Sequence, residues 1–84
     1  MYDLYLIFRS VTRAQAARAS LEQGRLPSRL IRSPRALSPE GCAYALILRS
    51  RDRSSALELL SKSGIRVEAQ YQRSADGSFG RLTE

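Results

Sequence analysis

Cys42 is the only cysteine among the 84 residues of this chain, and the chain has no histidine. The thiolate form of cysteine is a nucleophile, so Cys42 is the first candidate for chemistry. One cysteine without histidine excludes a Cys/His zinc site, a Ser-His-Asp triad and an internal disulfide built by this chain alone. The chemistry to look for is therefore that of a single thiol.

The carboxylates are spread along the chain, and no pair has a spacing typical of acid–base catalysis. The carboxylates that could take such a role are Asp3, Glu22, Glu40, Asp52, Glu58 and Glu68. We therefore expect a protein without stand-alone catalysis, and without a metal or cofactor.

The net charge of +6 comes from 14 basic residues against 8 acidic ones. All the basic residues except Lys62 are arginines, and they form no run of like charge. Such a surface attracts anions in general without selecting one class of partner. A chain of this length forms one small domain with one two-layer core.

Hydrophobic periodicity predicts the order strand, helix, strand, strand, helix, strand. The strands are expected at residues 4–8, 26–31, 43–48 and 65–71, and the helices at about 12–23 and between Asp52 and Gly64. This order is typical of the ferredoxin-like βαββαβ fold, an α+β fold with a four-stranded antiparallel sheet and both helices on one face. We expect one domain over residues 1–71 and a polar, flexible tail over 72–84. A hairpin turned at Asp76-Gly77 is the alternative for the tail.

In this topology the start of the third strand lies beside the end of the first. One rim of the sheet then gathers Cys42 with Arg9, Ser10, Arg13, Arg32, Ser33 and Arg35. Cations and a helix N-terminus favour the thiolate, which predicts a lowered pKa for Cys42. Glu40 opposes this by like-charge repulsion. The alternative is that Cys42 is simply a small buried residue at the start of a strand.

Several segments of residues 3–71 resemble the putative selenium/sulfur carrier-like family. They include the strand that ends in Phe8-Arg9-Ser10, the segment Leu26-Pro27-Ser28-Arg29-Leu30-Ile31 and the final helix and strand over 59–68. The most specific part is Pro34-Arg35-x-x-Ser38 followed by Cys42. In that family glycine usually follows the cysteine, whereas here Gly41 precedes it and Ala43 follows it.

The resemblance implies a small protein that works with a cysteine desulfurase or with selenium metabolism. The family's cysteine, here Cys42, would hold a persulfide or selenopersulfide and pass it to a partner. Arg32 and Arg35 would stabilise the anionic sulfur, and Ser38 would donate a hydrogen bond. Arg9, Ser10, Pro34 and Gly41 complete the predicted binding residues.

Two alternatives belong to other classes of protein. Tyr5 and Tyr44 lie on the two predicted central strands, where RNA-recognition domains carry stacking aromatics. However, residues 40–47 match the usual third-strand octet poorly, because Glu40, Cys42 and Ile47 occupy its basic and aromatic positions. We therefore expect no nucleic-acid partner. The other alternative is a small regulatory dimer that binds an anion or metabolite near Ser10 and Ser33.

An exposed sheet face with Tyr5, Ile7 and Tyr44 would form an apolar patch, which predicts a homodimer through that face. The apolar run over residues 4–8 is too short for a signal peptide or a membrane span. A single unpaired cysteine also suits a reducing compartment. We therefore expect a cytoplasmic protein with no membrane partner.

Overall fold

The computed structural model describes residues 2–37 and 43–82. It has an α+β architecture in which two helices pack against an antiparallel sheet of five strands. The elements are β1 (Leu4–Phe8), α1 (Val11–Gln23), β2 (Arg29–Arg32), β3 (Tyr44–Leu48), a 3-10 turn (Ser50–Asp52), α2 (Arg53–Lys62), β4 (Ala69–Arg73) and β5 (Phe79–Leu82).

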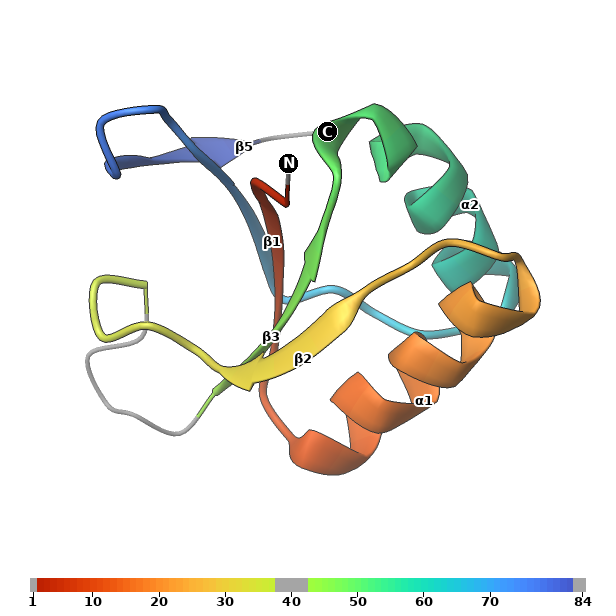
Figure 1. Ribbon diagram of the computed structural model, residues 1–84. Coiled ribbons are helices and arrows are strands. Elements are labelled where there is room, and N and C mark those ends of the chain that lie inside the picture. Colours follow the sequence, from red (N-terminus) through yellow and green to blue (C-terminus); the bar gives the residue numbers. More distant parts are fainter. Residues whose placement is uncertain (1, 38–42, 83–84) are drawn as a thin grey trace.

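The sheet has the order β2-β3-β1-β4-β5, and every neighbouring pair is antiparallel. Strand β3 therefore lies between β1 and β2, as the sequence predicts. Both helices cover the same face of the sheet (Figure 1). The expected number of four strands is wrong, because a fifth strand pairs with β4.

Side chains of β1 alternate between two apolar clusters, one on each face of the sheet. Leu4, Leu6 and Phe8 face the helices and are fully buried there with residues of α1, α2 and β3. Tyr5 and Ile7 face the other side and are 6% and 3% exposed. Because both faces of β1 are buried, its five residues read as one continuous apolar run rather than as an alternating pattern.

Strand β4 begins later than the sequence predicts, at Ala69 rather than Ile65. The chain bends at Glu68, whose amide donates to the Ile7 carbonyl at 2.9 Å. Before the bend, Ile65 and Val67 pack on the helix side, and after it Ala69 packs on the opposite side. The alternating apolar residues of 65–71 therefore do not all lie on one face of a single strand, as the period-two pattern predicts.

Residues of the predicted flexible tail form a hairpin with β4. At its turn the Asp76 carboxylate accepts hydrogen bonds from the amide and hydroxyl of Ser78, at 3.0 and 2.7 Å. These bonds lower the pKa of Asp76. Gly77 has φ +89, a conformation that favours glycine. Phe79 then packs edge-on against Tyr5, with ring centroids 5.0 Å apart. The hairpin alternative at Asp76-Gly77 is therefore the one that the structure has.

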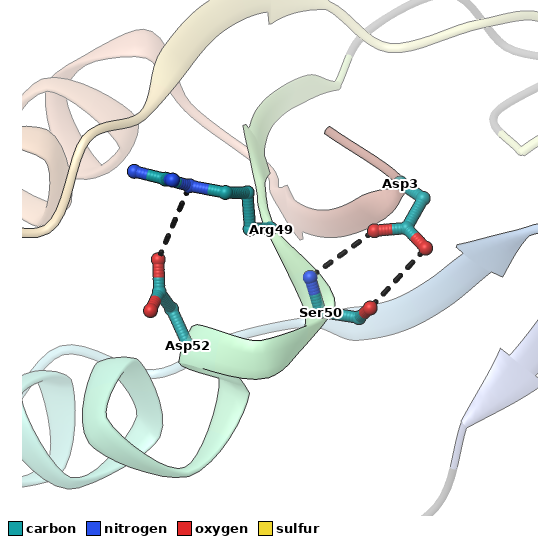
Figure 2. A network of polar contacts seen from close by, with 4 residues as sticks. All are labelled: Asp3, Arg49, Ser50 and Asp52. Atoms are coloured by element: carbon teal, nitrogen blue, oxygen red, sulfur yellow. Dashed lines mark hydrogen bonds and ion pairs between the residues drawn. The ribbon is translucent and has the colours of Figure 1, made fainter. Parts of the chain in front are cut away.

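The N-terminus is attached to two distant segments by the Asp3 carboxylate. Asp3 Oδ1 accepts from the Ser50 amide at 3.1 Å, and Oδ2 accepts from the Ser50 hydroxyl and Gln72 Nε2, both at 3.2 Å. Figure 2 shows the contacts with Ser50 beside the ion pair of Arg49 and Asp52, which spans 3.8 Å. One side chain thus joins the start of β1 to the end of β3 and the end of β4.

Both helices end in the same hydrogen-bonded turn, but with different residues in the left-handed position. After α1 the amide of Leu26 donates to the Leu21 carbonyl, and after α2 the amide of Ile65 donates to the Leu60 carbonyl, both at 2.9 Å. The left-handed residue is Gly64 after α2, with φ +70, but Arg25 after α1, with φ 61.

Gly24, the glycine that directly follows α1, has φ -84 and is not the left-handed residue. A Cβ atom at Gly24 would collide with the Leu59 side chain of α2. A larger residue at Gly24 would therefore require the Leu59 side chain to move. The left-handed position lies one residue later, at Arg25.

Replacing Asp3 should destabilise the fold, because the partly buried donors of Ser50 and Gln72 would lose their acceptor. We expect Asp3→Ala to lower the free energy of unfolding by about 1–3 kcal/mol in urea denaturation. Glu58→Gln is the control, since Glu58 makes only an exposed ion pair with Lys62. Equal losses in the two variants would contradict the structural role of Asp3.

The two helix ends should respond in opposite directions to changes at the left-handed residue. Arg25→Gly should raise the free energy of unfolding by about 0.5–1 kcal/mol, because it removes the strain of a side chain at positive φ. Gly64→Ala should lower it by about 1 kcal/mol for the same reason. Arg66→Gly is the control: Arg66 is exposed with negative φ, so glycine there should not stabilise. A loss of stability in Arg25→Gly would refute this explanation.

Candidate functional site

The sheet rim predicted from the topology is present at the end of β1. In the register of the sheet, Phe8 pairs with Tyr44 and Tyr44 pairs with Arg32, so the end of β1, the start of β3 and the end of β2 lie together. The Ser33 amide donates to the Ala43 carbonyl at 3.0 Å and extends this pairing by one step. Ser33 and Ala43 therefore lie side by side at this rim.

Three of the predicted site residues, Cys42, Ser38 and Gly41, lie outside the described residues. Two of their expected neighbours, Pro34 and Arg35, are described and belong to a turn that is closed by the Leu37 amide, which donates to the Pro34 carbonyl at 3.0 Å. Arg35 is exposed on this turn, while Leu37 packs against the apolar cluster on the face opposite the helices. The turn thus presents a cation to solvent while it is anchored on the sheet by Leu37.

Arg32 is held at the rim by an aromatic ring. Its guanidinium carbon lies 5.8 Å from the centroid of the Tyr44 ring, a distance typical of a cation–π contact. Within the described residues, no carboxylate lies within ion-pair distance of Arg32 or Arg35. These two positive charges are therefore not neutralised by the described part of the chain.

Arg9 was predicted to lie near the Cys42 thiol, but its side chain forms an ion pair with Glu68 instead. Its guanidinium pairs with the Glu68 carboxylate at 3.1 Å, on the side of β1 that faces β4 rather than β3. The cause is the bend before β4, which brings Glu68 beside the end of β1. Arg9 therefore contributes little net charge at the β2–β3 side of the rim.

The two serines of the rim are engaged in local backbone contacts. Ser10 is the N-cap of α1, and its hydroxyl accepts from the Arg13 amide at 3.1 Å. Ser33 is buried, and its hydroxyl donates to the Pro34 carbonyl at 3.4 Å. An anion at the start of α1 would compete with the Ser10 hydroxyl for the helix amide, which weakens the regulatory anion-site alternative at this place.

The register separates the two tyrosines on which the RNA-recognition alternative depends. Tyr5 faces away from the helices, whereas Tyr44 pairs with Phe8 and packs on the helix side. The prediction that they share one face is wrong. In the register of the sheet, Tyr44 lies opposite Phe8 on the helix side, and Ile47 is the β3 residue opposite Tyr5. They therefore cannot form one stacking platform.

The apolar patch predicted on the sheet face opposite the helices is also not exposed. Tyr5 and Ile7 are almost fully buried under partly buried side chains, among them Leu37, Tyr71 and Phe79. Over residues 2–37 and 43–82, the exposed large hydrophobic residues are Tyr2 and Val11. A homodimer stays a prediction, but an exposed apolar patch on this face no longer supports it.

Sequence reasoning missed a groove at the other end of the sheet, where β1 begins. It has a volume of about 550 Å³. Its lining consists of Tyr2, Tyr5, Ser28, Arg29, Ile47 and Arg73. These residues come from four separate segments, so no local motif marks them. The one sequence feature that could have indicated this groove is the presence of arginines at the start of β2 and at the end of β4, both of which are exposed.

Neither a metal site nor a membrane helix is found where the structure describes the chain. No group of three or more His, Cys, Asp or Glu side chains there could hold a metal ion. No helix within the same residues has the length and apolar character to cross a membrane.

Comparison with protein-family models matches residues 3–72 to the family described as putative Se/S carrier protein-like. Neither the comparison with curated proteins nor the one with solved structures gives a match. The matched region includes β1 to β4, both helices and the segment that contains Cys42. Because the match covers most of the 84 residues, the chain belongs to the putative Se/S carrier protein-like family.

Proposed function

We propose that this protein carries sulfur or selenium as a persulfide or selenopersulfide on Cys42 and delivers it to a partner protein. The family match over residues 3–72 is the observation on which this proposal rests. Two further features support it: Cys42 is the only thiol of the chain, and Arg32 and Arg35 near it in sequence lack carboxylate partners among the described residues.

The proposed reaction is an exchange without net oxidation or reduction. The Cys42 thiolate attacks the terminal sulfur of a donor persulfide, a new S–S bond forms, and the donor cysteine leaves as a thiolate. In delivery, a nucleophile of the acceptor attacks the terminal sulfur and the Cys42 thiolate leaves. Selenium would follow the same course. Because the chain has no second cysteine, it cannot release the sulfur by forming an internal disulfide.

Positive charge near the thiol would favour both the thiolate and the persulfide anion. In this proposal Arg32 and Arg35 supply that charge, and Ser38 donates a hydrogen bond to the terminal sulfur. Pro34 and Gly41 shape the segment. Arg9 and Ser10 take secondary roles, since Arg9 pairs with Glu68 and Ser10 caps α1.

Several further features belong to this proposal. We assign the four strands β1–β4 and the two helices to a ferredoxin-like unit, whose strand order 4-1-3-2 is present, with β5 added beside β4. A cysteine desulfurase or a selenium-metabolism protein is the proposed donor. The cytoplasm is the proposed compartment, because a lone thiol is maintained best under reducing conditions.

Sulfur loading gives the direct test. Incubation with a cysteine desulfurase and cysteine should add one sulfur atom to the intact protein, detected by mass spectrometry and removed by a reductant. Cys42→Ser should stay unmodified. If the wild-type protein gains no more sulfur than Cys42→Ser, the carrier function is refuted.

The pH dependence of Cys42 alkylation tests the electrostatic part separately. We expect a midpoint below the value of about 8.5 for a model thiol, because cations favour the thiolate. Arg32→Gln and Arg35→Gln should each raise the midpoint. Arg9→Gln is the matched control and should leave it unchanged, since Glu68 already neutralises Arg9. A wild-type midpoint at or above the model value would show that Cys42 is not an activated thiol.

A further inference from the structure

We propose that the groove at the start of β1 is a binding site for a small organic anion, a phosphate or carboxylate attached to an apolar group. This site is separate from the Cys42 segment. Ala43, the residue next to Cys42, precedes the start of β3, whereas the groove residue Ile47 lies near the end of β3. The proposal therefore stands or falls independently of the carrier function.

The groove is built on the sheet face opposite the helices. Its floor is a row across three strands, in which Ile47 of β3 pairs with Tyr5 of β1 on one side and with Arg29 of β2 on the other. Arg73, the last residue of β4, lies beyond Tyr5. The volume of about 550 Å³ is within the range of small-molecule sites.

Arg29 and Arg73 stand on opposite sides of this floor. Strands β2 and β4 are separated by β3 and β1, so their backbones lie three strand spacings apart, roughly 14 Å. Both side chains are exposed. Two cations that flank one groove favour a ligand with negative charge, and a guanidinium group binds carboxylate or phosphate oxygens with two hydrogen bonds.

No carboxylate of the described residues neutralises these arginines, because each one is engaged elsewhere. Asp3 accepts from Ser50 and Gln72, and Asp76 accepts from Ser78. The remaining four form ion pairs: Glu22 with Arg18, Asp52 with Arg49, Glu58 with Lys62 and Glu68 with Arg9. Arg29 and Arg73 therefore have no ion-pair partner among the described residues.

Ser28, which also lines the groove, has a polar group without a hydrogen-bond partner among the described residues. Its hydroxyl oxygen is buried and has no hydrogen-bond partner within the described chain, although Ser28 lines the groove. A buried hydroxyl without a partner costs about 1–3 kcal/mol, so such groups normally find one. A small rotation of the Ser28 side chain toward the groove would let a ligand oxygen held by Arg29 accept a hydrogen bond from this hydroxyl. Tyr5 and Ile47 offer the ligand an apolar floor, which explains why an organic anion fits better than an inorganic one.

The test is a titration of the full chain with three probes: phenyl phosphate, benzoate and inorganic phosphate. Backbone amide shifts in NMR should change saturably for Ser28, Arg29 and Ile47 with phenyl phosphate or benzoate, and the stronger of the two identifies the anionic group. Inorganic phosphate should bind more weakly because it lacks the apolar part. Absence of saturable shifts with both organic probes would overturn the proposal, as would equal affinity for inorganic phosphate.

Variants then test the residues. Arg29→Gln and Arg73→Gln should each weaken binding about tenfold, the value of one charge-assisted hydrogen bond. Arg81→Gln is the matched control: Arg81 is exposed and pairs in register with Tyr71 on the same face, but it does not line the groove. Equal weakening in Arg81→Gln would show attraction by net charge alone and would overturn the site. Cys42→Ser should bind like the wild type, which separates this outcome from that of the carrier function.

Discussion

The structure depends on the burial of β1 on both of its faces and along both of its edges. Leu4, Leu6 and Phe8 fill the space beneath the helices, while Tyr5 and Ile7 fill the opposite side. Strands β3 and β4 complete the hydrogen bonds of β1 on its two edges. A strand of five apolar residues can be buried in this way only when other segments cover both faces. The hairpin with Phe79 and the turn with Leu37 provide the second cover.

The register imposed by β1 decides which residues can act together. Because side chains alternate, Tyr44 is placed on the helix side, where its ring packs near Arg32. Tyr5 is placed on the other side, where it forms part of the groove floor. A shift of one residue in β3 would reverse this assignment. The same alternation therefore removes an RNA-stacking surface, and it places Arg29, opposite Ile47, and Arg32, opposite Tyr44, on different faces of the sheet.

The position of the few carboxylates determines which arginines remain available. The chain has fewer acidic than basic residues, and the described acids are all engaged. Arg9 is neutralised because the bend before β4 brings Glu68 to it. Arg32 and Arg35 at one end, and Arg29 and Arg73 at the other, have no such partner in the described part of the chain. The distribution of charge in this small domain thus follows from the fold rather than from the order of arginines along the sequence.

The sequence by itself determined the elements whose signals are local. Apolar runs predicted β1 and β3, and hydrophobic periodicity predicted α1, because these signals depend on a few neighbouring residues. The order of elements also predicted that β3 lies between β1 and β2. Only the tertiary structure decided the rest. Phe79 joins the sheet because Tyr5 is available to pack against it, and the Leu59 side chain of the other helix comes close to Gly24. The pairing of Arg9 with Glu68 and the groove between Arg29 and Arg73 likewise join residues that are far apart along the chain, and such contacts leave no local pattern to read.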